Sequence, residues 1–217
     1  MSPYVVTLLC MIVSFCICGI PFGLIVARTQ GVDVRKAGSG NIGMTNVART
    51  VGGKAAAITF ALDVLKGTFC VLLSRLVIAK LCLGGNWALT APQQELGWCA
   101  SMVWAACVLG HVFSPWLGFH GGKGISVGLG AGLGLCWPVA LLAFAVFLIV
   151  AIPSHYVSLG SICAAIALPV WAFVFDFTPQ ALAPTVVVAA LVIWSHRENI
   201  KRLRTGTERP FSLHKKS

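Results

Sequence analysis

GSGNIGMTNVARTVGG, residues Gly38–Gly53, is the stretch around which the chain is organised, because it lies directly between two long apolar segments. It combines five glycines with two asparagines, Ser39, Thr45 and Arg49, and it has little apolar side-chain surface to bury. Unobstructed backbone N–H groups, short polar side chains and an arginine are the groups that surround a bound phosphate. The alternative interpretation is a flexible glycine-rich loop at a membrane surface, since a loose glycine pattern alone is not specific.

The composition places the chain in a membrane. It is 58% hydrophobic and only 10% charged, with a mean hydropathy of +0.89, and no soluble domain of this length can bury so much apolar surface. Apolar runs of about 20 residues recur along it, which is the length of a membrane-spanning helix. The first run, Tyr4–Ala27, follows no basic residue and shows no evident cleavage site, so we expect a retained span rather than a removed signal peptide.

The cysteines and the charge exclude two other classes of function. None of the nine cysteines forms a CxxC pair and most lie within apolar segments, so we expect small packing residues, with no metal site and no cofactor. The net charge of +10 does not indicate a nucleic-acid partner. The basic residues cluster at the ends of the apolar runs, as the positive-inside rule and an anionic lipid surface predict.

The apolar runs predict one all-α integral membrane domain, residues 1–217, with seven transmembrane helices, some of them short, and glycine-rich cytoplasmic loops. We expect the helices over residues 4–27, 54–83, 97–112, 123–136, 137–152, 156–175 and 180–194. The fourth and fifth divide one apolar stretch, in which four glycines weaken the first half and Pro138 interrupts the middle. Seven spans put the N-terminus outside and the basic tail, 197–217, in the cytoplasm, whereas six would put that tail outside.

Beyond Lys54 at its start, the second predicted span contains four charged residues. Asp63 and Lys66 are three residues apart and share one helical face. Charge at that depth is costly and normally faces protein or water, so the pair either locks the bundle as an internal ion pair or forms a wall of the anion site. Arg75 and Lys80 lie toward the outer end, against the positive-inside pattern, and snorkelling to the interface is the explanation that the sequence offers.

Two further polar stretches follow on the cytoplasmic side. In the second, HVFSPWLGFHGGKG at 111–124, Lys123 stands between glycines, although the spacing of a nucleotide-binding P-loop is absent. We expect this lysine to bring positive charge to a phosphate; a lysine that only reaches the interface is the alternative. In the third, His196 and Asn199 would share a face with Ile200 if the last span continues as a helix. Three such stretches at one membrane face suggest one composite site for a substrate with a phosphate and a long acyl chain.

Three blocks of sequence carry a resemblance to a known family: GSGNIGMTNVAR with the downstream DVLKG, GHVFSPWLGFHGGKG, and HRENIKRLRTGTE. Together they resemble the integral-membrane glycerol-3-phosphate acyltransferases that use acyl phosphate as donor, the PlsY family, over essentially the whole chain. The resemblance implies a seven-helix fold in the bacterial cytoplasmic (inner) membrane. It implies transfer of a fatty acyl group from acyl phosphate to the 1-hydroxyl of sn-glycerol-3-phosphate, giving lysophosphatidic acid and phosphate, the first step of phospholipid synthesis. Membrane lipid and functional coupling to the enzyme that produces acyl phosphate follow as expected partners.

The resemblance also implies roles for individual residues. Ser39, Arg49 and Lys123 would hold the phosphate of glycerol-3-phosphate. His196 and Asn199, together with Ser39, would be the catalytic set that orients the hydroxyls or the acyl phosphate. The remaining substrate-binding residues would shape the two glycine-rich loops: Asn41, Gly43, Thr45, Asn46, Gly121, Gly122 and Gly124.

Supporting roles are expected for Asp63, Lys66 and Glu198. The chain departs from the family pattern at a few positions, such as Met44, where a small residue is usual, and 125–127, where Ile-Ser-Val replaces a more usual Val-Ala-Thr run. These departures leave the expected chemistry intact.

The residues agree with a reaction that needs no protein nucleophile. The chain has no His-x4-Asp pair, and its one match to the GxSxG spacing, GISVG at 124–128, falls in a predicted membrane helix and not at the strand-to-helix turn that a serine nucleophile needs. Because an acyl phosphate is already activated, holding and neutralising two anions can supply most of the catalysis. The general base is left open between the substrate phosphate and His196. A small transporter for an organic phosphate is the alternative class, although no inverted repeat is evident, and a non-catalytic membrane scaffold is a third.

Overall fold

The computed structural model describes residues 1–211, which contain helices and no strand, as expected for an all-α chain. The first half comprises α1 (Pro3–Gly19), α2 (Phe22–Arg28), α3 (Met44–Thr50) and α4 (Gly53–Cys82). The second half comprises α5 (Trp98–Val112), α6 (Ile125–Ser154), α7 (Val157–Val174), α8 (Pro179–Ser195) and α9 (Arg197–Arg204). Two short 3-10 helices, η1 (Trp87–Thr90) and η2 (Pro115–Leu117), lie in the connections before and after α5.

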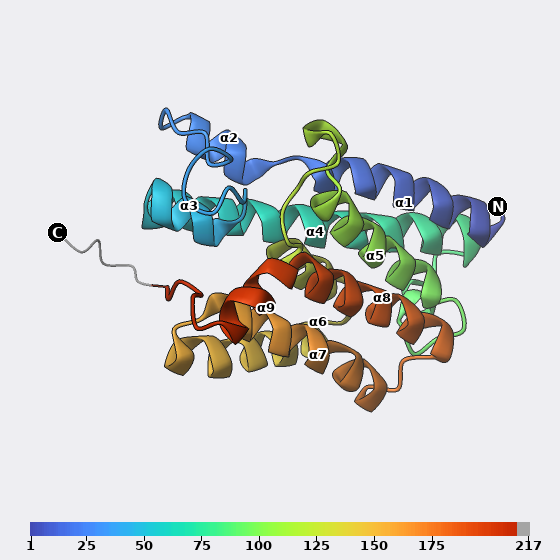
Figure 1. The fold of residues 1–217 in the computed structure, drawn as a ribbon. Helices are drawn as coiled ribbons and strands as arrows, with labels where there is room; N and C mark the ends of the chain where they lie inside the picture. The colour runs from blue at the N-terminus through green and yellow to red at the C-terminus, as the bar shows by residue number, and fades with distance from the viewer. Residues whose placement is uncertain (212–217) are drawn as a thin grey trace.

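Helix α5 forms the centre of the bundle and packs against α1, α4, α6 and α8. Of its 15 residues, 12 are buried, whereas the outer faces of the surrounding helices expose large apolar side chains such as Tyr4, Phe69 and Phe173. An apolar exterior of this kind is what lipid requires. Five of the described helices are long and apolar enough to cross a membrane, or six if the bent pair α8–α9 is one span. The long helices run side by side, and α2, α3 and α9 lie at the end away from the N-terminus (Figure 1).

The first predicted span is broken, which corrects the expectation of one continuous helix over 4–27. Helix α1 ends at Gly19 and α2 begins at Phe22, with Pro21 between them. Proline has no N–H to continue the helical ladder, and the break leaves the carbonyl oxygen of Ile20 accessible. Lys66 Nζ of α4 donates to that oxygen at 2.8 Å. The break therefore creates a binding point for a buried lysine.

The predicted division of the stretch 125–152 is confirmed. Within α6 the backbone of Cys136 is extended, with φ −151° and ψ 90°, one residue before Trp137, at which we expected the second helix to begin. A Cβ placed on Gly132 would lie 3.2 Å from the Cβ of Ala140, although eight residues of a continuous helix would span about 12 Å. The chain therefore turns back at Cys136, and α6 is a helical hairpin with arms 125–135 and 137–154. Both ends of α6 consequently lie at the same end of the bundle.

Arg75, which the sequence left with no partner, holds the tip of this hairpin. Its Nη1 donates to the carbonyl oxygens of Gly134 at 2.8 Å and Leu135 at 3.2 Å. Its Nε donates to Thr90 Oγ1 at 2.9 Å, and the guanidinium lies 4.3 Å from the centre of the Trp87 ring. A helix that ends inside the bundle leaves its last carbonyls without partners, so the buried guanidinium satisfies the end of the short arm.

Candidate active site

The first glycine-rich segment is held in shape by one buried side chain, Asn46. Its Nδ2 donates to the carbonyl oxygens of Val34 (3.0 Å), Ala37 (3.1 Å) and Asn41 (2.8 Å), and its Oδ1 accepts from the N–H of Ser39 at 2.8 Å. The three carbonyl oxygens share the two N–H hydrogens of the amide, and the amide oxygen accepts one bond. Asn46 thus closes the loop over residues 34–43 and fixes the backbone that carries Ser39.

Part of this segment is helical, which corrects the expectation of a loop throughout 38–53. Residues Met44–Thr50 form α3, and its Val47 is fully buried in a small apolar cluster with Val34 and Ile42. The helix carries Thr45 and Arg49 beside the cavity described below. Arg49 Nη2 donates to the carbonyl oxygen of Arg209 at 3.1 Å. The segment is therefore an ordered cradle with a positive group at its edge rather than a flexible loop.

The second glycine-rich loop lies flat against the end of α5. The N–H of Gly121 donates to the carbonyl oxygen of Val112 at 2.9 Å, and that of Gly122 to the carbonyl oxygen of His111 at 3.0 Å. A Cβ on Gly121 would come within 1.9 Å of the His111 oxygen, and one on Gly122 within 2.2 Å of His111 Nε2, so any side chain at either position would displace the loop. Gly124, with φ +81°, then turns the chain into α6. This path points the side chain of Lys123 toward α9.

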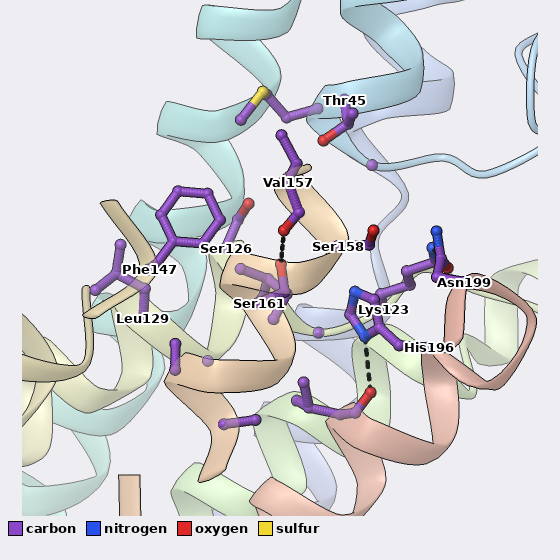
Figure 2. A pocket seen from close by; sticks show the side chains of 18 of the residues that line it. Thr45, Lys123, Ser126, Leu129, Phe147, Val157, Ser158, Ser161, His196 and Asn199 are labelled. Atoms are coloured by element: carbon purple, nitrogen blue, oxygen red, sulfur yellow. Dashed lines mark hydrogen bonds between the residues drawn. The ribbon is translucent and has the colours of Figure 1, made fainter. Parts of the chain in front are cut away.

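The third stretch begins at a bend, so the last span does not continue as one straight helix. The axes of α8 and α9 differ by 56°, and His196 lies at the bend, buried at 3% exposure. Its Nδ1 lies 2.8 Å from the carbonyl oxygen of Val192. Because that oxygen can only accept, a neutral ring carries its proton on Nδ1 and presents Nε2 as an acceptor. Asn199 follows one turn later and lies beside Lys123 and His196 (Figure 2).

Asn199 joins the second and third stretches through a short chain of polar contacts. Its Oδ1 accepts from Lys123 Nζ, and its Nδ2 donates to Glu208 Oε1 at 2.7 Å. The two partners fix the orientation of the amide, since a lysine can only donate and a carboxylate can only accept. Lys123 and Glu208 therefore interact through Asn199 and not directly.

Glu208 is a site residue that the sequence analysis did not single out. Besides Asn199, it accepts from Ser158 Oγ and Arg202 Nε, both at 2.7 Å, and its side chain is 7% exposed. Burial opposes its ionisation, but these hydrogen bonds outweigh burial and lower the pKa of the carboxyl. Glu198, which was expected to support the site, is exposed and makes none of these contacts. The only signal for Glu208 was its place in the third sequence block.

Lys123 is only partly compensated by its surroundings. Burial lowers its pKa to about 8, Glu208 opposes this shift, and Arg202 and Arg49 add to it by repulsion. A lysine that is partly desolvated and surrounded by other cations gains from an incoming anion. The arrangement therefore favours an anionic ligand at Lys123.

A cavity of about 600 Å³ connects the three stretches. Its polar end contains most of the residues expected from the sequence: Ser39, Asn41, Gly43, Thr45, Asn46, Arg49, Lys123, Gly124, His196 and Asn199. Its other end is apolar, with Leu129 and Phe147 among the lining side chains on the arms of α6 (Figure 2). Gly121, Gly122 and Glu198 instead line a second hollow of about 350 Å³, which shares Ser39, Lys123 and Asn199 with the first.

Asp63 and Lys66 form the buried ion pair that was one of the two alternatives. Lys66 Nζ lies 2.6 Å from Asp63 Oδ1 and 3.3 Å from Nδ1 of His111, a second residue that the sequence analysis did not single out. Asp63 and His111 line the cavity, whereas Lys66 does not. The backbone oxygen of His111 accepts from the N–H of Gly122. The ion pair therefore helps, through His111, to hold the second glycine-rich loop in place. Asp63 also lines the cavity.

Fold and site together define a class: a helical membrane protein in which a basic, glycine-framed pocket opens into an apolar cavity. Residues 8–206 match the family model described as glycerol-3-phosphate acyltransferase. The chain is 42% identical over 199 residues to the glycerol-3-phosphate acyltransferase of Geobacter sulfurreducens, covering 92% of this chain and 94% of that one. It is 40% identical over 212 residues to the enzyme of the same name from Thermosynechococcus vestitus, with 96% of each chain covered.

Solved structures that resemble this chain belong to the same family. The crystal structure of PlsY (YgiH), an integral membrane glycerol 3-phosphate acyltransferase, in its glycerol 3-phosphate form superposes with a TM-score of 0.82 at 36% identity, covering 95% of this chain and 96% of that one. The lysophosphatidic acid form gives a TM-score of 0.80 with the same coverage. The chain belongs to the glycerol-3-phosphate acyltransferase family of the PlsY type. The family resemblance seen in the three sequence blocks is thereby confirmed.

Proposed function

We propose that this protein transfers a fatty acyl group from acyl phosphate to the 1-hydroxyl of sn-glycerol-3-phosphate, releasing lysophosphatidic acid and phosphate. The observation that carries the proposal is the cavity of about 600 Å³, whose basic end contains Lys123 and Arg49 and whose apolar end lies between the arms of α6 and their neighbours. A phosphorylated acceptor fits the first end and an acyl chain fits the second. Family membership favours this enzyme over the transporter and the scaffold.

The residues divide into groups that bind and groups that orient. Lys123 and Arg49 neutralise the phosphate of glycerol-3-phosphate, while Ser39, whose backbone is fixed by Asn46, offers its hydroxyl group as a donor. Asn199, oriented by Glu208, positions a substrate oxygen. None of these groups becomes covalently attached to the acyl chain, because the acyl phosphate is already activated.

In the transfer step the 1-hydroxyl oxygen forms a bond to the acyl carbon, and the bond from that carbon to the phosphate oxygen breaks. The hydroxyl proton passes either to the substrate phosphate or to Nε2 of His196, which is free to accept because Nδ1 faces Val192. Inorganic phosphate leaves with both electrons of the broken bond. Holding two anions side by side is the main energetic task, and the basic residues perform it.

We propose an orientation with seven membrane helices, in which the two arms of α6 count separately and the first arm is a short one. The N-terminus then lies outside, and the three polar stretches and the basic tail lie in the cytoplasm of a bacterial cell, at the inner membrane, where the enzyme that produces acyl phosphate can supply the donor. The excess of basic residues in those stretches supports this orientation. The last six residues of the tail, 212–217, lie outside the described part of the chain.

The test uses purified protein in lipid nanodiscs with glycerol-3-phosphate and palmitoyl phosphate, in the absence of CoA and carrier protein. We expect phosphate and lysophosphatidic acid to appear in equal amounts, and Ser39→Ala, Arg49→Ala and Lys123→Ala to reduce both together. Activity with palmitoyl-CoA but not with palmitoyl phosphate would overturn the donor. Folded protein that is inactive with both donors but moves glycerol-3-phosphate into sealed vesicles would replace the enzyme with the transporter.

A further inference from the structure

Three cysteine thiols from three helices meet in the core of the bundle. They are Cys18 of α1, Cys70 of α4 and Cys107 of α5, and their sulfur atoms all lie within 4.8 Å of one another. Their exposed fractions are 0%, 3% and 0%. Packing alone explains why small apolar residues fill this core, as the sequence analysis expected. It does not require three sulfur atoms to converge on one point.

The three cysteines lie next to the buried ion pair of Asp63 and Lys66. Cys70 follows Lys66 by four residues on α4, and Cys107 precedes His111 by four residues on α5, so each cysteine is one helical turn from a member of that network. Cys18 Sγ lies 3.9 Å from the backbone oxygen of Lys66. His111 lines the cavity, so the cavity wall comes within one helical turn of Cys107.

The number of thiols and their surroundings narrow the chemistry of a ligand. Within the described residues, no further His, Cys, Asp or Glu joins the group. Zinc in structural sites takes four ligands, so a three-sulfur site suits it poorly. Thiolates select soft, thiophilic elements.

The net charge of the occupied site distinguishes the thiophilic elements that could bind to three thiolates. Three thiolates with Cu(I) carry a net charge of −2 and with Zn(II) a net charge of −1. The nearest cation, Lys66, is already paired with Asp63. An uncompensated charge in this core would be expensive. A trivalent element bonded to three sulfurs leaves no charge at all.

We propose that Cys18, Cys70 and Cys107 form a three-thiol site for a trivalent thiophilic element, with arsenite as its representative. Neutral arsenous acid, As(OH)₃, enters from the cavity. Three As–S bonds form while three As–O and three S–H bonds break, and three water molecules leave. No oxidation state changes, and reactant and product are both uncharged. Occupation draws α1, α4 and α5 together one turn below Lys66 and His111, and so disturbs the support of the second glycine-rich loop.

The binding experiment uses the full-length, fully reduced protein in nanodiscs, titrated with arsenite. Bound arsenic is measured by elemental mass spectrometry after desalting, and the arsenic–sulfur bonds by their near-ultraviolet absorption. We expect one arsenic per chain in the wild type and in the controls Cys16→Ser and Cys163→Ser, whose thiols lie outside the cluster. Cys18→Ser, Cys70→Ser and Cys107→Ser should each weaken binding at least tenfold. Equal binding by all six proteins would overturn the site, as would tighter binding of Zn²⁺ than of arsenite.

A second probe separates loss of the site from loss of the fold. Methylarsonous acid can form only two bonds to sulfur, so each single variant should still bind it through the two remaining thiols. A variant that binds neither reagent while remaining monodisperse would contradict the three-thiol site. The site does not depend on the proposed function. One additional readout depends on the proposed function, namely inhibition of acyl transfer by arsenite. We expect this inhibition in the wild type and the control variants but not in Cys70→Ser.

Discussion

Lys66 and Lys123 are both drawn into the bundle, yet their surroundings differ in kind. Lys66 is 3% exposed and contacts a carboxylate at 2.6 Å, a carbonyl oxygen and an imidazole nitrogen. Lys123 contacts the neutral amide of Asn199, and the nearby Arg49 and Arg202 repel it. A lysine whose charge is fully compensated holds the structure together. A lysine whose charge is only partly compensated binds better when an anion arrives.

The largest expected effect comes from removing the compensated lysine. Lys66→Met leaves the Asp63 carboxylate buried without a counter-charge, which costs about 3–5 kcal/mol of stability. We expect a large fall in the midpoint of unfolding and in the yield of monodisperse protein. The double variant Asp63→Asn/Lys66→Met should recover much of that loss, and Lys80→Met, at the exposed end of α4, is the control. A single variant as stable as the wild type would show that the pair is not a structural lock.

The second-largest expected effect is on substrate binding and not on stability. Lys123→Ala should keep the unfolding midpoint close to that of the wild type but raise the KM for glycerol-3-phosphate. Loss of a charge-assisted hydrogen bond worth about 1.5–3 kcal/mol corresponds to roughly a tenfold to hundredfold increase. Lys36→Ala, in the exposed part of the first loop, serves as the charge-matched control. By contrast, Asn199→Ala should lower kcat more than it raises KM, and an unchanged KM in the lysine variant would remove its assigned role.

The pH dependence of substrate binding tests whether Lys123 is only partly compensated, with a smaller expected effect than the substitution. Because the pKa of Lys123 is lowered to about 8, its charge is present at neutral pH and lost above pH 8. The KM for glycerol-3-phosphate should therefore rise above pH 8, by at most about tenfold per pH unit, and this rise should be absent in Lys123→Ala.

Without bound substrate, the contribution of Lys123 to folding stability changes with pH in the opposite direction to its contribution to substrate binding. Between about pH 8 and 10.5 the unfolded chain keeps the proton that folded Lys123 has lost, so this group makes the fold more stable as pH rises. Binding and stability measured across the same range should thus move in opposite directions in the wild type.

The smallest expected effect distinguishes two glutamates of the tail. Glu208→Gln weakens three hydrogen bonds and the orientation of Asn199, and we expect kcat/KM to fall about tenfold, consistent with about 1.4 kcal/mol. Glu198→Gln, whose side chain is exposed, should change it less than twofold. If the two variants behave alike, Glu198 regains the supporting role that the sequence analysis gave it.

The positions of the long helices could be predicted from the sequence because lipid imposes a simple rule on apolar length. Even the hairpin in α6 left a signal, since glycines and Pro138 weaken the stretch at its centre. The break at Pro21 was missed because the surrounding residues are uniformly apolar and hydropathy alone does not register a missing N–H. The end of the last span near residue 194 could be predicted, but whether the helix continues was left open, so the angle at His196 was not determined.

The candidate site was predictable where the chemistry is local and not where it depends on tertiary contacts. The three polar stretches carry recognisable combinations of residues, so Ser39, Lys123 and Asn199 could be named. Glu208 joins the site only because the chain after α9 folds back on α7 through Ser158. His111 could not be recognised because it lies within an apolar run, and its partner Lys66 is 45 residues away.

The contact between Arg75 and the tip of α6 has a consequence for how the protein is made. The guanidinium enters the membrane with α4, and the carbonyl oxygens that satisfy it are synthesised 59 and 60 residues later. The first arm of α6, about 16 Å long at 1.5 Å per residue, is too short to cross a bilayer core of about 30 Å by itself. Thr90 and Trp87 reach Arg75 soon after α4 is made, but its contacts are complete only once the first arm of α6 has been synthesised.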